Sequence, residues 1–263
     1  MKEKIRQALL QAGAVAVGFA AAGEIDPSVA LKYEKWVGEG FNGEMEYLKR
    51  HIPLRRHTDN VLPEAKTVIS IAFSYVPELW RDPKLPSLSA YAYGEDYHIV
   101  LRDILRPVVK DLKNQFGGKW RICIDSAPVE ERFWAVMAGI GFIGLNGAII
   151  TQKAGSLCFL VEIISTLSIQ PDNPCLDSCI SCGKCLEACP GKALFGDGTM
   201  DARRCINYLT IEKKTPLNPE EEAFLETYPA IKGCDRCLRV CPHNQNLAPS
   251  SIPRFHPPRE ANP

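Results

Sequence analysis

Four cysteines close together in the sequence are the residues best suited to bind a metal cofactor. Cys179, Cys182, Cys185 and Cys189 follow the spacing C-x2-C-x2-C-x3-C, and Pro190 comes directly after the last of them. At this spacing a tight loop directs three thiolates to one cubane, whereas the fourth leaves the loop and ligates a different cluster. The run therefore predicts two 4Fe-4S clusters rather than one.

A second group of cysteines supplies the remaining ligands. Cys234, Cys237 and Cys241 repeat part of the pattern, with Pro242 after the last, and Cys205 lies between the two groups. If the last cysteine of each group crosses to the other cluster, eight thiolates form two complete sets. The first cluster is then held by Cys179, Cys182, Cys185 and Cys241. The second cluster is then held by Cys189, Cys205, Cys234 and Cys237.

Zinc and disulfides are the alternative uses of these thiols. Zinc also binds C-x2-C pairs, but three cysteines at constant spacing followed by Cys-Pro suit a cubane better than a tetrahedral ion. The chain has eleven cysteines, an odd number, and their clustering favours metal and a reducing compartment. Cys123 and Cys158 fall in expected strands and are core candidates. The role of Cys175, which lies near the first group, stays open.

The composition is that of a folded protein. The chain has 263 residues, of which 46% are hydrophobic and 24% charged, and we expect two domains. Its 31 basic and 31 acidic side chains give a formal net charge of zero, so the total does not indicate a polyanion or an anionic membrane as partner. Basic stretches at 47–57 and 201–205 are candidates for nucleic-acid contact, although each also fits a solvated surface.

The first 23 residues allow two interpretations. Early lysines and a small-residue stretch resemble a secretory signal, but Glu3 and Gln11 fit that interpretation badly. Ile5 and Leu9 fit one stripe of a helix that Gly13 ends before a strand at 14–19. We therefore expect a cytoplasmic protein. No run of about 18 apolar residues is present, so we expect no membrane-spanning helix.

The remaining pattern predicts an α/β domain followed by a cysteine-rich one. Strands are expected at 67–73, 120–124 and 157–164. Helices are expected at 98–117, with a kink at Pro107, and over the segment after Pro128 as far as the glycines before 147. The composition changes near 166. We expect domains at 1–165 and 166–245, and a proline-rich tail at 246–263 that is extended or loosely packed.

Asp125 is the carboxyl group best placed for chemistry in the first domain. It directly follows an expected strand, and Ser126, Ala127 and Pro128 then interrupt the chain before the next helix. Side chains at strand ends line crevices, and a carboxyl group there can act as a general acid. An Asp in this position is also typical of a turn or a helix cap.

Several longer motifs carry a resemblance to a known family. The sequence resembles the epoxyqueuosine reductases, enzymes of the last step of queuosine synthesis on tRNA, from about residue 40 to about residue 245. The motifs are "GEMEYLKRHIPLR", "VLPEAKTVISIA", "YAYGEDYH", "IDSAPVEER", "AGIGFIGLN", "DARRCINYLTIE" and "GCDRCLRVCPHN". They are specific in combination, although no single one is.

The resemblance implies a cobalamin-dependent iron–sulfur enzyme, related also to reductive dehalogenases. Its expected fold is α/β (α+β), a nitroreductase-like cobalamin-binding domain followed by a bacterial dicluster ferredoxin-like domain. The implied reaction removes the epoxide oxygen as water through Co(I), with Asp125 as the proton donor. By family position, the cobalamin contacts are Tyr97, His98, Ser126 and Asn146. The implied partners are tRNA containing epoxyqueuosine and an external low-potential electron donor.

Some residues depart from known patterns. "DYHIVL" begins like the D-x-H-x-x-G element that supplies a histidine to cobalt, but position 101 is Leu, and we predict no histidine ligand. His98 also fits a simple helix start. Leu145 stands where the family usually has Lys, and His243 where it usually has Trp. Longer members continue with a helical-repeat domain. These departures affect the expected binding of tRNA more than the expected cofactors, because replacing Lys by Leu removes a positive charge.

Three functions are therefore considered. The first is reduction of epoxyqueuosine in tRNA. The second keeps the same catalytic machinery but acts on a small epoxide or halide. The third is a dicluster electron-transfer protein without a corrinoid, in which the "DSAP" segment forms only a turn.

Overall fold

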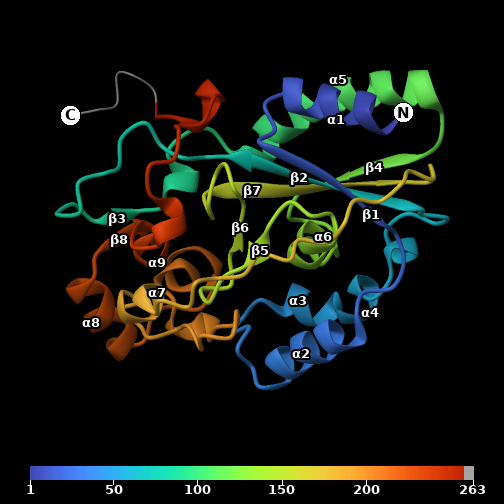
Figure 1. Cartoon of the computed structure of the whole chain (residues 1–263). Helices are drawn as coiled ribbons and strands as arrows, with labels where there is room; N and C mark the ends of the chain where they lie inside the picture. The colour runs from blue at the N-terminus through green and yellow to red at the C-terminus, as the bar shows by residue number, and fades with distance from the viewer. Residues whose placement is uncertain (258–263) are drawn as a thin grey trace.

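A four-stranded antiparallel sheet forms the centre of the protein (Figure 1). The computed structural model describes residues 1–257. In sheet order the strands are β1 (Ala16–Ala21), β2 (Thr67–Ser74), β7 (Cys158–Ser165) and β4 (Trp120–Cys123). β2 is buried along its whole length, as its β-branched and aromatic sequence TVISIAFS favours.

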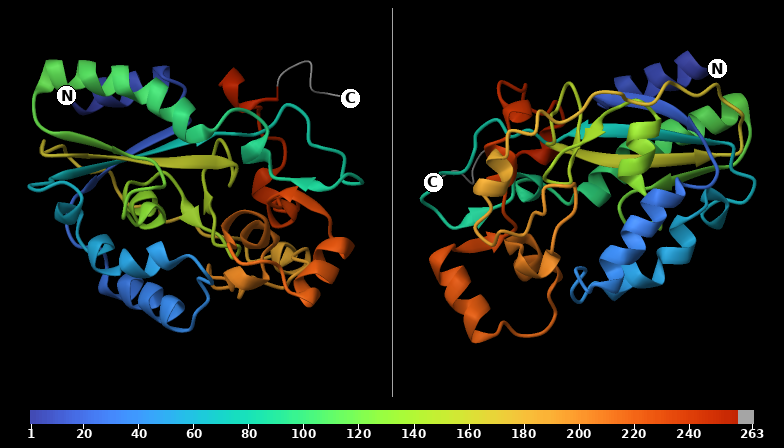
Figure 2. Two further views of the ribbon diagram at one scale, coloured as in Figure 1. Left: turned by 180° about the vertical axis from the view of Figure 1, so that it is seen from behind. Right: turned by 60° about the horizontal axis from the view of Figure 1, so that its bottom comes forward.

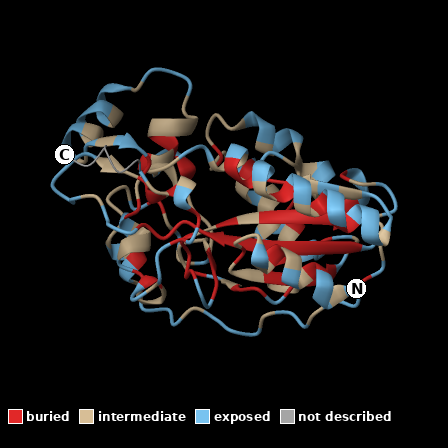
Figure 3. Cartoon of the chain, turned by 90° about the horizontal axis from the view of Figure 1, so that it is seen from above, coloured by how far each residue is buried: buried red, intermediate tan, exposed pale blue. Residues whose placement is uncertain are grey.

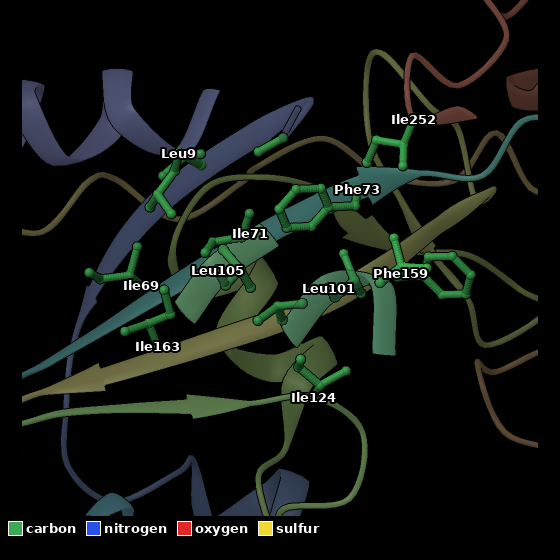
Figure 4. Close-up of a cluster of buried hydrophobic side chains, with 14 of the residues drawn as sticks. Leu9, Ile69, Ile71, Phe73, Leu101, Leu105, Ile124, Phe159, Ile163 and Ile252 are labelled. Carbon is green, nitrogen blue, oxygen red and sulfur yellow. The ribbon is translucent and has the colours of Figure 1, made fainter. Parts of the chain in front are cut away.

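Alternation along the strands separates two cores. Ile69, Ile71 and Phe73 of β2 point to the face covered by the helices α1 (Lys2–Gln11) and α5 (Tyr97–Phe116) (Figure 4). Successive strand residues alternate between faces, so Val68 and Ala72 face the other side. Each buried Leu, Ile or Phe contributes roughly 1.5–3 kcal/mol, which makes the first core the main source of stability.

The helix α5 positions the site and is well defined by its ends. The Asp96 side chain caps its first turn by accepting a hydrogen bond from the His98 backbone N–H at 2.8 Å. Leu101 and Leu105 pack on the sheet (Figure 4). Gly117, at φ +71°, ends the helix as expected, and Pro107 lies inside it.

The opposite face of the sheet is covered by α6 (Glu131–Met137), with three further helices below it in Figure 1. These are α2 (Pro27–Gly38), α3 (Glu46–Arg50) and α4 (Ile52–Arg55). Within residues 1–257, no helix combines the length and apolar composition that a bilayer crossing requires.

The cysteine-rich segment lies at one end of the sheet in each view (Figures 1 and 2). Its regular elements are α7 (Lys184–Glu187), α8 (Pro219–Thr227), β8 (Ala230–Lys232) and α9 (Arg236–Arg239). The strand β8 pairs in parallel with β3 (Ser87–Leu88), which ties this segment to the first half of the chain. Asp172 adds a second tie, because its backbone N–H donates to Phe19 O at 2.8 Å and its carboxylate pairs with Lys2 and Arg6.

The expected strands at 67–73, 120–124 and 157–164 are confirmed, whereas two other expectations differ. The first strand occupies 16–21 rather than 14–19. The helix after Pro128 ends at Met137, and the following residues form a hairpin of β5 (Phe142–Ile143) and β6 (Ile149–Ile150). Gly139 ends the helix because its φ is +74°. Glycine is needed at this position, since a Cβ there would lie 2.4 Å from Asn173 O.

The segment after the last cysteine also differs from the expectation of loose packing. Ile252 and Phe255 are buried in the core under α1 and α5, and Figure 3 shows the buried residues concentrated around the central strands. Prolines shape the backbone there, but burial of these two apolar side chains holds it against the fold. The end of the expected tail, 258–263, lies outside the described residues.

Candidate functional site

Asp125 lies in a sharp turn at the end of β4. Its φ is +53°, a left-handed conformation that costs about 1–2 kcal/mol for most residues and that Asp tolerates best after Asn and Gly. The backbone N–H of Asp125 donates to Glu131 Oε1 at 3.0 Å, which holds the turn to the start of α6. The Asp125 side chain is 62% exposed and so is open to a substrate.

The first two residues of α5 face this carboxylate. Tyr97 Oη donates to Asp125 Oδ2 at 2.6 Å, and His98 Nε2 lies 3.7 Å from the same oxygen. Asp96 Oδ1 lies 2.9 Å from His98 Nδ1, and this contact orients the imidazole towards Asp125. The cap of α5 therefore positions both side chains.

Tyr97 is held on both faces of its ring. It stacks on Phe159 with centroids 4.3 Å apart and planes 7° apart, and on His98 at 4.0 Å. Burial and the neighbouring Asp125 carboxylate raise the pKa of Tyr97 far above its usual value. The phenol therefore stays protonated and donates to Asp125.

Sequence reasoning did not single out the other residues around this carboxylate. Tyr91 meets Tyr97 edge to face at 6.3 Å. Burial raises the pKa of Tyr47 to about 12, with Glu212 and Asp125 adding to the effect. Burial also raises the pKa of Tyr91 to about 12, with contributions from Asp235, Glu212 and Asp125. These residues lie within the quoted motifs, and only the folded chain brings them to Asp125.

Two further carboxyl groups extend inwards from the turn. Burial, followed by the charge of Asp125, raises the pKa of Glu131 to about 8. Glu162 is fully buried on β7 opposite Cys123, and its Oε1 accepts a hydrogen bond from Ser70 Oγ at 3.1 Å. Burial, followed by Glu131, raises the pKa of Glu162 well above its usual value. Both groups therefore favour the protonated form near neutral pH.

The eight clustered thiols border two separate cavities. The first cavity is lined by Cys179, Cys182, Cys185 and Cys241. The second cavity, of about 230 Å³, is lined by Cys189, Cys205, Cys234 and Cys237. Thiols of one set influence each other: burial raises the pKa of Cys205, and Cys234 and Cys189 raise it further. Within residues 1–257, no three Cys, His, Asp or Glu side chains converge closely enough to hold a single ion.

The surroundings of these thiols fit iron–sulfur clusters. The backbone N–H of Ala193 donates to Cys189 Sγ at 3.2 Å, and the N–H groups of Asn207 and Tyr208 favour the thiolate of Cys205. Ser181 at φ +53° and Gly183 at φ +74° shape the loop of the first set. Backbone N–H groups directed at sulfur stabilise the thiolate, and the iron charge offsets the cost of burying it.

Aromatic residues connect the second cavity to Asp125. Tyr75 and Tyr91 line this cavity, and Tyr91 contacts Tyr97, which donates to Asp125. The structure thus brings Tyr97 and His98 to Asp125. Asn146 instead lines both thiol cavities.

The remaining residues singled out from the sequence lie elsewhere. Ser126 lines a different cavity, beside the Asp125 turn. Cys123 is buried and Cys158 is partly buried, and burial raises the pKa of both thiols to about 12. Cys175 lines neither thiol cavity, and its backbone N–H donates to Val136 O at 2.9 Å.

Comparison with known families matches two parts of the chain. Residues 178–244 match the family described as a 4Fe-4S double cluster binding domain. Residues 55–126 match the family described as epoxyqueuosine reductase QueG, DUF1730.

Individual relatives cover most of the chain. The epoxyqueuosine reductase of Cyclobacterium marinum is 38% identical over 232 residues, which are 87% of this chain and 74% of the relative. A crystal structure of epoxyqueuosine reductase with a tRNA-Tyr epoxyqueuosine-modified stem loop superposes with a TM-score of 0.85 and 30% identity, covering 98% of this chain and 69% of that one. The reductive dehalogenase NpRdhA shares the fold, with a TM-score of 0.54 and 15% identity over 96% of this chain and 32% of that one.

Proposed function

The chain belongs to the epoxyqueuosine reductase family, and from this premise we propose that it reduces epoxyqueuosine to queuosine in tRNA. The observation that carries the proposal is the contact of Asp125 with Tyr97 and, through Tyr91, with the cavity of the second thiol set. Asp125, as the proton donor to the epoxide oxygen, then lies close to the cluster that supplies the electrons. The relative crystallised with an epoxyqueuosine-modified stem loop supports tRNA as the substrate.

We assign the cofactors to two parts of the chain. Residues 1–165 form the cobalamin-binding catalytic domain, 166–245 the domain of two 4Fe-4S clusters, and 246–263 the tail. The first cluster takes the thiols of the first cavity and the second cluster those of the second cavity, because each cavity is bordered by four thiols.

The aromatic residues near Asp125 suit a flat corrinoid. The edge of Tyr97 and the ring of Tyr91 lie near the carboxylate, and Tyr75 continues this lining to the second thiol cavity. When bound, cobalamin supplies the two-electron reducing power for breaking the carbon–oxygen bonds. We propose that no histidine of the chain ligates its cobalt, since Asp96 orients His98 towards Asp125 instead.

The residues at and around Asp125 supply the proton for the departing oxygen. Conversion of the epoxide to an alkene and water consumes two electrons and two protons. Asp125 delivers a proton to the departing oxygen, and Tyr97, by donating to Oδ2, leaves Oδ1 to face the substrate. His98, 3.7 Å from Oδ2, is placed to return a proton to Asp125. Glu131 holds the Asp125 turn in place through the backbone.

An external low-potential donor supplies the electrons, and we propose that it meets the first cluster. Cys182 is exposed, and the neighbouring Ile180 exposes 59% of its surface. Exposed apolar residues beside a redox centre suit a transient protein contact. A cytoplasmic location accords with a tRNA substrate and with clustered thiols.

The decisive experiment is turnover of the reconstituted protein on tRNA containing epoxyqueuosine. The protein is loaded anaerobically with iron, sulfide and cobalamin, reduced, and the nucleosides are analysed by mass spectrometry. We expect queuosine to appear and epoxyqueuosine to decline. If cobalamin binds but tRNA is unchanged while a small epoxide or halide is reduced, the substrate assignment is wrong. If cobalamin does not bind, the protein is an electron carrier.

A further inference from the structure

The cavity that Ser126 lines, beside the Asp125 turn, is separate from the two thiol cavities and is lined by arginines. It measures about 250 Å³ and lies between α5 and β4. Its charged lining consists of Arg102 and Arg106 from α5 and Arg121 from β4, and Ser126, Ala127 and Pro128 of the turn complete one side. No acidic residue belongs to this lining.

The basic stretches that stand out in the sequence are partly paired. Arg55 and Arg56 pair with Glu130 and Glu34, and Arg203 pairs with Asp201, whereas Lys49, Arg50 and Arg204 form no ion pair within residues 1–257. Arg102, Arg106 and Arg121 are exposed and likewise form no ion pair in this part of the chain, and they share one cavity. The cavity therefore holds three positive charges without a partner in the described chain.

The fold alone gives no reason for this grouping. Arg102 and Arg106 are four residues apart on one helix, and like charges at this spacing destabilise a helix by about 0.2–0.5 kcal/mol. Arg121 Nη1 donates to Val61 O at 2.7 Å, which fixes the guanidinium without compensating its charge. An anionic ligand would remove the repulsion, and the guanidinium fork matches two oxygens of a phosphate.

The cavity also lies close to the residues of the proposed reaction. His98, Arg102 and Arg106 follow one another at four-residue steps of about 6 Å along α5. The first of them lies 3.7 Å from Asp125, and the Asp125 turn lines the cavity. Arg102 and Arg106 therefore lie about 6 and 12 Å along α5 from the histidine that neighbours Asp125.

We propose that Arg102 and Arg106, with Arg121 at the edge of the cavity, bind a backbone phosphodiester of the RNA strand whose modified nucleotide reaches Asp125. This inference rests on the proposed function. The net charge of the chain is zero, so attraction of RNA needs a local concentration of positive charge such as this one. The nucleotide loop of cobalamin also carries a phosphodiester, and the test must separate the two sources.

The test compares RNA binding by variants of the reconstituted holoprotein. The variants are Arg102→Gln/Arg106→Gln, the charge-conserving Arg102→Lys/Arg106→Lys, and the control Lys4→Gln/Lys153→Gln. The control removes two exposed charges outside the cavity. The probe is an unmodified tRNA anticodon stem loop, and fluorescence anisotropy gives its Kd over a series of salt concentrations.

We expect the glutamine variant to bind the stem loop at least tenfold more weakly than wild type. The slope of log K against log salt should fall by roughly 0.7, because one phosphate contact of a single strand contributes about that much. The lysine variant should show nearly the wild-type salt slope but only part of the wild-type affinity. Lysine keeps the positive charge but lacks the planar guanidinium that binds two phosphate oxygens. The control should bind like wild type.

A second measurement compares binding of cobalamin with that of cobinamide, which lacks the nucleotide loop. The glutamine variant should keep the wild-type preference between the two. Wild-type RNA affinity in this variant overturns the inference, and loss of the cobalamin preference then assigns the arginines to the corrinoid. Failure of wild type to bind RNA overturns the proposed substrate as well. The thermal midpoint monitors folding, and the single variants replace the double one if it unfolds.

Discussion

The phenol oxygen of Tyr97 lies 2.6 Å from Oδ2 of Asp125 and links the first residue of α5 to the turn after β4. These residues are 28 positions apart in the sequence, and each is also held by a contact with a third residue. Tyr97 is held by its stacking on Phe159, and Asp125 by its backbone contact with Glu131. The proposed proton donor is thus oriented through both its side chain and its backbone.

Tyr97→Phe should lower kcat by roughly 10- to 100-fold, because a hydrogen bond to a charged group contributes about 1.5–3 kcal/mol. The ring still stacks on Phe159, so corrinoid affinity should change little. The measurement is turnover of epoxyqueuosine in a stem loop. Tyr33→Phe is the matched control, because it removes a hydroxyl that donates to Leu48 O at 2.9 Å. Equal rates in both variants would refute the orienting role.

Asp125→Asn should abolish turnover, by at least about 100-fold, while iron content and cobalamin binding stay at wild-type levels. The amide keeps the shape of the side chain but cannot deliver the proton. Asp111→Asn, an exposed position on α5, serves as the control and should turn over normally. If Asp125→Asn retains wild-type kcat, another group is the acid.

The raised pKa of Glu131 predicts how stability depends on pH. Its folded pKa of about 8 exceeds the usual 4.5, so the folded protein binds more protons than the unfolded chain between these values. The free energy of unfolding should therefore fall as pH rises from about 4.5 to about 8. Asp125, Arg55 and Glu130 face this group, and burial is the main cause of the shift.

Glu131→Gln tests this dependence, because Gln resembles the protonated acid and can still accept the Asp125 N–H. Anaerobic denaturant unfolding between pH 5.5 and pH 8 measures it. We expect a shallower loss of stability in the variant, with Glu162 supplying the rest of the slope. Glu226→Gln, at an exposed position, should follow wild type. An unchanged slope in Glu131→Gln would contradict the assignment.

Cys205→Ser should remove one cluster and leave the other. Iron content after anaerobic reconstitution should fall from about eight to about four per chain, because Cys205 belongs to the second thiol set only. Cys175→Ser should keep about eight, since that thiol lines neither cavity. Iron analysis and EPR of the reduced protein provide the readout. Eight irons in Cys205→Ser would exclude this cysteine as a required ligand.

Much of the fold follows from local sequence. The apolar and β-branched run of β2 predicts a buried strand, and Asp96 and Gly117 mark the two ends of α5. Such features depend on backbone preferences over a few residues, so neighbours in sequence suffice to specify them. The shortened α6 and the packed Ile252 were missed, because both depend on contacts with distant segments.

The types and spacing of the thiols, the periods of the strands and helices, and the place of Asp125 after a strand can all be read from the amino-acid sequence. The surroundings of that carboxylate and the pairing of the charged side chains depend on how the chain folds. Tyr97 contacts Asp125, Tyr91 contacts Tyr97, and Arg121 lines one cavity with two arginines of α5, because the sheet and the helices bury their apolar faces together. That packing is non-local and fixes which polar side chains share a site.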